Sequence, residues 1–255
     1  DAGSLYKICN GNLLFHACVP LNADGSLMET EVFGETYKGR ALYDVMERYV
    51  RAAFDDANPE LAKRGRDLLW YMWLGEGSPL FAKSKMATFE LYLIAEKEAR
   101  KEVKNSFYSY LDDERVMGGI FEDFGMDPET SRIVCGHVPV KVKDGEDPVK
   151  CGGRVLTIDG GFSKAYQPTT GIAGYTLISN SYGFVLAAHE PLESMRAAVV
   201  NELDIHSSRK VVELVDKRTL VADTDNGSVL KQQIADLEEL LEAYRCGILA
   251  EKEEE

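Results

Sequence analysis

Residues 132–167 constrain the fold more strongly than any other stretch of the chain. They contain a short apolar run that ends in Gly136-His137, a polar excursion, and a second apolar run that ends at Asp159. Short apolar runs between turn residues are typical of buried strands. In open α/β sheets, ligands bind beyond the carboxyl ends of the strands. We therefore expect His137 and Asp159 to lie at the rim of a site.

Composition excludes several classes of partner. The chain has 29 Lys and Arg against 43 Asp and Glu, a formal charge of −14, so a basic nucleic-acid-binding face is not expected. The sequence shows neither an apolar run long enough to span a membrane nor an opening signal segment. The five cysteines are an odd number without a CxxC pair, which favours buried, reduced thiols and a cytoplasmic location.

Apolar periodicity divides the chain into hairpins and helices. Asn10-Gly11 predicts a hairpin within residues 5–20, because both positions of such a turn need positive φ. A second hairpin is predicted at 174–189, and a short strand at 210–214. Asn58 and Pro59 are a typical cap and first residue of a helix. Helices are predicted at 40–57, 59–74, 88–110, 112–125, 192–203 and 229–249.

Two of the four histidines are candidate metal ligands. His16 and His137 both stand near the end of an apolar strand, 121 positions apart, and neutral imidazole is the commonest protein metal ligand. The alternative is that each ring bonds to the backbone, and spacing leaves both possibilities open. His189 is expected to have a structural role, and His206 to be exposed. A zinc site that combines these histidines with Cys18 and Cys135 is conceivable, but ordinary buried cysteines are the simpler interpretation.

Lysines and a glycine turn are candidate phosphate contacts. Lys83 and Lys85 lie in a Gly-, Ser- and Pro-containing loop, and ammonium groups bind phosphate as point charges. The alternative is a solvated loop. Ser163 and Lys164 follow Gly160-Gly161, whose backbone amides could hold an anion or could only form a tight turn. No GxGxxG or P-loop motif is present, and Ser163 has no base beside it.

Several motifs occur together in the order found in a known family. They are NLLFHACVP at 12–20, WYMW at 70–73, SPLF at 78–81, KMATFE at 85–90, GHVPV at 136–140 and IDGGFSKAYQ at 158–167. The combination resembles class III, Firmicutes-type fructose-1,6-bisphosphatase of the calcineurin-like metallophosphoesterase superfamily. The similarity extends from about residue 5 to the C-terminal helix.

The resemblance implies a fold and a set of site residues. The fold class is α/β, with helices segregated as in α+β proteins: part of an αββα sandwich within residues 1–190, a helical insertion at about 38–128, and an extension at 191–255. His16 and His137 would be ligands of two divalent ions, manganese by resemblance. Lys83, Lys85, Lys164 and Ser163 would contact phosphate. Asp159 would lie at the rim of the site and contact the metal ligands without binding the metal itself.

The resemblance also implies what the chain lacks. The family's early motifs, Asp-x-His, Gly-Asp-x-x-Asp-Arg and Gly-Asn-His-Glu/Asp, are absent. We expect this chain to be the C-terminal portion of a gluconeogenic enzyme, without catalytic residues and inactive alone. Expected partners are a sugar phosphate, the N-terminal half and further copies in a homo-oligomer. The alternative is a non-catalytic module that binds a sugar phosphate or a subunit.

Overall fold

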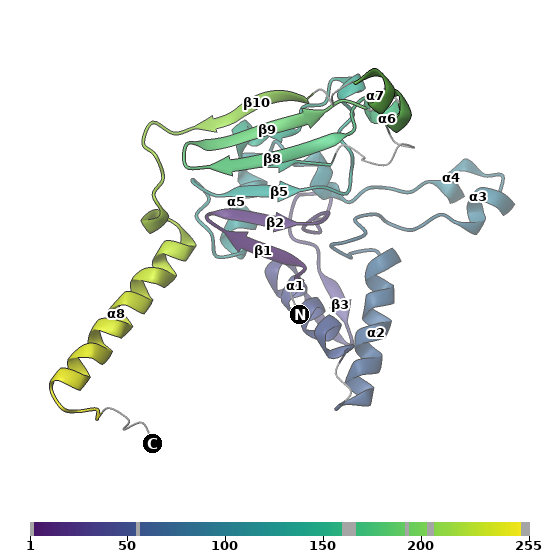
Figure 1. The fold of residues 1–255 in the computed structure, drawn as a ribbon. Helices are drawn as coiled ribbons and strands as arrows, with labels where there is room; N and C mark the ends of the chain where they lie inside the picture. The colour runs from purple at the N-terminus through teal and green to yellow at the C-terminus, as the bar shows by residue number, and fades with distance from the viewer. Residues whose placement is uncertain (1–2, 55–56, 160–166, 192–193, 203–206, 251–255) are drawn as a thin grey trace.

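A mixed five-stranded sheet forms the centre of the molecule (Figure 1). The computed structural model describes residues 3–54, 57–159, 167–191, 194–202 and 207–250. The sheet has the order β1-β2-β5-β7-β6 and consists of β1 (Tyr6–Cys9), β2 (Asn12–Phe15), β5 (Arg132–Cys135), β7 (Val155–Thr157) and β6 (Val149–Lys150). The strands β2, β5 and β7 are parallel, while β1 and β6 run antiparallel at the edges.

The parallel arrangement decides where the site can form. Leu13 pairs with Ile133, and Ile133 pairs with Val155. All three side chains are fully buried, as expected for strands with both faces covered. Because parallel strands end at the same edge, the residues that follow β2, β5 and β7 meet there. The turn between β1 and β2 has positive φ at Asn10 and Gly11, which confirms the predicted hairpin.

Helices α1 (Gly39–Ala52) and α2 (Pro59–Leu74) pack closely against each other. A Cβ on Gly65 would lie 2.3 Å from the carbonyl oxygen of Tyr49, so only glycine permits this approach. The predicted cap of α2 is confirmed, since the side chain of Asn58 accepts a hydrogen bond from the backbone N–H of Leu61 at 3.1 Å. Helix α5 (Glu114–Asp123) and the 3₁₀ turn η1 (Ser106–Ser109) contribute Phe121 and Phe107 to the main core.

A second sheet of order β10-β9-β8 contains the predicted hairpin of β8 (Gly174–Asn180) and β9 (Gly183–His189). Strand β10 (Ser207–Leu214) begins three residues earlier than predicted and pairs with β9. It therefore links the proposed extension, 191–255, to the sheet of the preceding segment. The division at residue 190 stays a prediction.

The remaining elements are short, apart from one helix. They are the hairpin β3 (Thr30–Val32) and β4 (Glu35–Tyr37), the helices α3 (Phe89–Leu93), α4 (Lys97–Arg100), α6 (Gln167–Thr170) and α7 (Met195–Asn201), the 3₁₀ turns η2 (Val142–Asp144), η3 (Cys151–Gly153) and η4 (Val221–Asp223), and the long α8 (Asp225–Arg245). Within the described residues, no helix is both long and apolar enough to cross a membrane.

The predicted helix at 88–110 was wrong. The segment instead leaves and re-enters the body as an arm that carries α3 and α4 (Figure 1). Its base is closed by hydrogen bonds from Ser84 N–H to the Val103 carbonyl, 2.8 Å, and from Asn105 N–H to the Ala82 carbonyl, 2.8 Å. Neither α3 nor α4 buries a residue. Large apolar side chains of α3, namely Phe89, Tyr92 and Leu93, stay 75–86% exposed. Because no tertiary packing stabilises one long helix here, pairing across the base prevails.

Candidate functional site

His16 and His137 meet at the edge where β2 and β5 end. Nε2 of His16 lies 3.0 Å from Nδ1 of His137, and the ring planes are inclined by 72°. The backbone N–H of Gly136 donates to the carbonyl of His16 at 2.9 Å, which holds the two loops together. The structure thus brings together the two residues that the sequence singled out as metal ligands.

The turn that presents His137 is tightly constrained. His137 has φ of 67°, a left-handed conformation that is uncommon for a residue with a side chain and costs energy. A Cβ on Gly136 would lie 3.4 Å from Cβ of Asp159 and 3.6 Å from the His16 carbonyl. The Val138 N–H closes the turn on the Gly136 carbonyl at 2.8 Å. Surrounding contacts therefore maintain the strained conformation that directs His137 toward His16.

The electrostatic environment favours a neutral imidazole at His137. Burial lowers its pKa, and the nearby His16 and Lys83 lower it further. The backbone carbonyl of Phe81 and the carboxylate of Asp159 act in the opposite direction but do not outweigh these effects. The neutral form has the free nitrogen lone pair that a metal ion requires.

Asp159 lies at the same edge, after β7. Its backbone carbonyl accepts a hydrogen bond from Val140 N–H at 2.8 Å, and Ile158 N–H donates to the Cys135 carbonyl at 2.9 Å. Asp159 contributes electrostatically to the environment of both His137 and Tyr108. The predicted position of Asp159 beside the histidines therefore agrees with the structure.

Two tyrosines that the sequence analysis did not identify support the His16 loop. The hydroxyl of Tyr43, on α1, donates to the Cys18 carbonyl at 2.8 Å, and that of Tyr108, on η1, donates to the Ala17 carbonyl at 3.0 Å. Burial raises the pKa of both hydroxyls, so both remain protonated donors. No sequence motif marks these two tyrosines. The only available signal is the general rule that a buried tyrosine hydroxyl has a hydrogen-bond partner.

The predicted phosphate contacts have different surroundings. Nζ of Lys83 forms an ion pair with Glu102 at 2.6 Å. The positive charge of Lys83 also contributes to the lowered pKa of His137. Lys85 donates to the Ala99 carbonyl in the arm. Both lysines thus contact the segment that was predicted to be helical. Ser163 and Lys164 lie outside the described residues.

The cysteines do not complete a metal site in the part of the chain that is described. Cys18 and Cys135 are buried, and burial raises the pKa of Cys135 to about 12 and that of Cys18 further still. No group of three or more His, Cys, Asp or Glu residues there could hold a metal ion. All five cysteines are free thiols; Cys18, Cys135 and Cys151 are buried as expected, but Cys9 and Cys246 are exposed. Cys9 is the last residue of edge strand β1, and Cys246 is the residue that follows α8.

His189 lies apart from this pair, in the second sheet. The ring nitrogens of His189 bond to the hydroxyls of Thr176 and Ser207, both at 2.8 Å, so His189 joins β8, β9 and β10. This agrees with the expected structural role. His206 lies outside the described residues.

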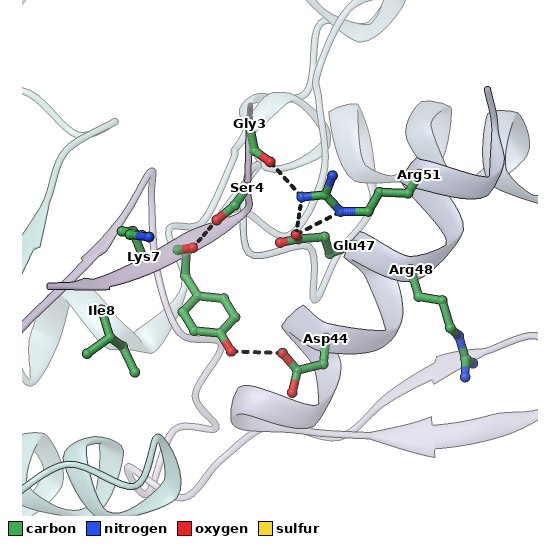
Figure 2. A pocket seen from close by; sticks show the side chains of 9 residues that line it. Gly3, Ser4, Lys7, Ile8, Asp44, Glu47, Arg48 and Arg51 are labelled. Carbon is green, nitrogen blue, oxygen red and sulfur yellow. Dashed lines mark hydrogen bonds and ion pairs between the residues drawn. The ribbon is translucent and has the colours of Figure 1, made fainter. Parts of the chain in front are cut away.

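Two of the hollows formed by the described residues bear on where the site lies. One, of about 930 Å³, is formed by β1, the residues before it and α1 (Figure 2). Its polar groups bond mainly to one another: Tyr6 donates to Asp44 at 2.9 Å, and Arg51 binds Glu47 at 2.6 Å. A smaller crevice of about 160 Å³ lies beside residues 138–140 and is lined in part by Lys104, Tyr108 and Lys150. The crevice, rather than the larger hollow, adjoins the histidine turn.

Comparison with known proteins identifies close relatives. Residues 1–246 match the model of the family described as Firmicute fructose-1,6-bisphosphatase. The chain is 52% identical over 253 residues to a class 3 fructose-1,6-bisphosphatase of Clostridium botulinum (strain Langeland), and 50% identical over 252 residues to one of Clostridium tetani. These alignments cover 99% and 98% of the chain, respectively, but 38% of each relative. No solved structure matches the chain. The chain belongs to the Firmicute fructose-1,6-bisphosphatase family.

Proposed function

We propose that these residues are the C-terminal part of a class 3 fructose-1,6-bisphosphatase and supply two histidine ligands to its metal centre. The single observation that carries this proposal is the 3.0 Å approach of His16 Nε2 to His137 Nδ1 at the carboxyl edge of the parallel strands. Two imidazole nitrogens this close could bind one ion or two neighbouring ions after a small rotation of the rings. The fit is partial, because two imidazoles are fewer ligands than a stable metal site needs.

The remaining ligands would come from parts of the full-length protein outside these residues. The relatives are much longer than this chain, which spans 38% of their length. Within the described residues, Asp159 adds a negative charge near His137 and could help to orient its ring. We propose that the two sheets form part of an αββα sandwich whose other part carries the missing donors.

The proposed reaction is hydrolysis of the 1-phosphate of fructose 1,6-bisphosphate in cytoplasmic gluconeogenesis. When bound, two divalent ions, manganese in this proposal, would activate a water and neutralise phosphate oxygens. His16 and His137 would bind and orient this centre. Lys83 forms an ion pair with Glu102 at 2.6 Å. It would therefore have to release Glu102 before it could bind the sugar phosphate.

The test uses the full-length protein and measures phosphate release from fructose 1,6-bisphosphate with manganese. We expect His16→Ala and His137→Ala each to reduce kcat/KM by about 100-fold or more. Mutation of a residue that merely hydrogen-bonds to a metal ligand already lowers activity about 10- to 100-fold. His189→Ala is the matched control, because its ring bonds to Thr176 and Ser207 of the second sheet. Near-normal turnover in either site variant would refute the assignment of ligands.

A second measurement addresses the chain alone. We expect no appreciable turnover from residues 1–255 with manganese, and no calorimetric binding of fructose 1,6-bisphosphate in the presence of chelator. Turnover at the rate of the full-length protein would contradict the need for outside ligands. Specific binding that persists without metal would favour a non-catalytic sugar-phosphate-binding module.

A further inference from the structure

Helix α8 exposes an apolar stripe along most of its length. It projects from the body of the molecule (Figure 1), and its only buried residue is Gly227, in the first turn. The stripe consists of large side chains that remain 42–62% exposed: Leu230, Ile234, Leu237, Leu240, Leu241 and Tyr244. An amphipathic helix normally buries such a face, so another surface is needed to cover it.

The base of α8 is firmly attached to the central sheet. The side chain of Asp225 accepts a hydrogen bond from Asn10 N–H at 2.7 Å, and the side chain of Asn10 accepts one from Asp225 N–H at 2.9 Å. Thr224 caps the helix by accepting from Gly227 N–H at 3.1 Å. A Cβ on Gly227 would lie 1.9 Å from the Val221 carbonyl, so the first turn sits directly against η4. The helix therefore projects in a defined direction.

The spacing of the stripe matches a coiled-coil seam. Leu230, Ile234, Leu237, Leu241 and Tyr244 follow one another at intervals of 4, 3, 4 and 3 residues. These intervals are the alternation of heptad positions a and d, with Ile234 and Leu241 at a and Leu230, Leu237 and Tyr244 at d. A helix that packs onto a globular core usually carries a wider stripe, whereas this seam suits a second helix of the same kind.

The residue types favour a parallel pair. In a parallel coiled coil, Ile at position a with Leu at position d, as in Ile234 and Leu237, favours two strands over three or four, while the second a position is Leu241. The flanking pairs across such a dimer would be Gln233 with Glu238 and Leu240 with Arg245, neither of which repels. An antiparallel pair centred on the seam would instead place Glu238 of one chain beside Glu238 of the other, and the two negative charges would repel.

The available area is close to what a stable dimer needs. At roughly 200 Å² for each large side chain, the exposed fractions of the six stripe residues amount to about 600 Å² per helix. A standard stable interface buries about 800 Å² per partner. The stems of flanking residues such as Lys231 and Glu238 would cover further apolar surface at the seam margin. The 21-residue helix is about 32 Å long, enough for three heptads.

We propose that α8 is a dimerisation helix that forms a parallel two-stranded coiled coil with α8 of a second copy of this chain. The interface uses the 230–244 seam and leaves the histidine edge of the central sheet outside the contact. The inference does not depend on the proposed catalytic function, so either can fail without the other.

The first test measures the mass of the full 255-residue chain by analytical ultracentrifugation over a concentration series. We expect a dimer for the unchanged chain and for Ala235→Glu, which changes an exposed residue on the opposite side of α8. We expect Leu237→Glu to raise the dimer dissociation constant by at least about 100-fold. A monomer at all concentrations, or a dimer that Leu237→Glu leaves unchanged, would overturn the proposal.

The second test remains valid if a charged seam residue perturbs the helix. In a Cys9→Ser, Cys246→Ser background, which removes both exposed thiols, single cysteines are introduced as Leu237→Cys or Glu239→Cys and oxidised. Position d faces its own copy in a parallel pair, so we expect Leu237→Cys to form a disulfide-linked dimer and the outward-facing Glu239→Cys not to. Equal cross-linking of both variants, or none at Leu237→Cys, contradicts the parallel seam.

Discussion

The rings of His16 and His137 approach to 3.0 Å between Nε2 and Nδ1, although 121 positions separate the two residues. Each histidine follows a strand of the parallel part of the sheet. The Gly136 N–H donates to the His16 carbonyl and so joins the two loops. The pair is therefore a product of strand order: β2 and β5 are neighbours, and both end at the same edge.

The support of the His16 loop by Tyr43 is expected to contribute measurably to stability. Tyr43→Phe removes the hydroxyl that donates to the Cys18 carbonyl in a fully buried setting. We expect the free energy of unfolding in urea to fall by about 1–3 kcal/mol, because a buried polar group loses its partner. Tyr110→Phe, which removes an exposed hydrogen bond to the Ala23 carbonyl, should cost under about 0.5 kcal/mol. Equal losses for the two variants would show that burial at Tyr43 is not the cause.

Gly65 is expected to be required where α1 meets α2. A Cβ there would lie 2.3 Å from the Tyr49 carbonyl and 2.7 Å from the Ala53 backbone nitrogen, so Gly65→Ala must separate the helices. We expect a loss of about 1–3 kcal/mol, as for other overpacked contacts. Gly119→Ala is the matched control in α5, where a Cβ meets nothing within 4 Å, and it should stabilise the protein by up to about 1 kcal/mol. Thermal or urea unfolding measures both, and a stabilising Gly65→Ala would contradict the close packing.

The ion pair of Lys83 with Glu102 at the base of the arm is expected to weaken in acid. Burial acts to raise the pKa of Glu102, but hydrogen bonds from Lys83 and from Ala87 N–H outweigh it and the pKa is lowered. The ionised carboxylate therefore stabilises the fold above the unfolded pKa of about 4.3, and this contribution is lost as pH falls through the lower folded value.

Amide hydrogen exchange at Ala87 measures this effect. We expect Glu102→Gln to reduce protection of the Ala87 amide at pH 7, because the neutral amide binds Lys83 less strongly. Glu98→Gln, which changes an exposed residue of the same arm, should leave it unchanged. Protection that is identical in Glu102→Gln and the unchanged protein would rule out a role for the carboxylate.

Arg132 is expected to couple the two sheets through its planar group. Its guanidinium lies 5.0 Å from the centroid of the Phe184 ring and pairs with Glu213 on β10. Arg132→Lys keeps the charge but loses the planar stacking, and we expect a loss of about 0.5–2 kcal/mol in urea unfolding. Arg64→Lys, at the more exposed contact with Phe33, should cost less. A double-mutant cycle with Phe184→Leu should show coupling, and strict additivity would argue against the ring contact.

Local physical chemistry determined much of the architecture from the sequence alone. The Asn10-Gly11 turn, the Asn58 cap with Pro59, and the 174–189 hairpin all follow from backbone preferences of a few adjacent residues. The Gly-His and Asp-Gly-Gly signatures likewise marked the ends of β5 and β7. These features depend on interactions within a few positions, which the sequence contains in full.

Only the tertiary structure decided the features that depend on distant segments. The arm at 84–103 replaced a predicted helix because its base pairs across some twenty residues, and the supporting hydroxyls of Tyr43 and Tyr108 reach the His16 loop from separate elements. The adjacency of β2 and β5, together with the strained turn at His137, brings His16 to His137. The apolar stripe of α8 could be read from the sequence, but its exposure could not, because exposure depends on whether any other part of the fold packs against the helix.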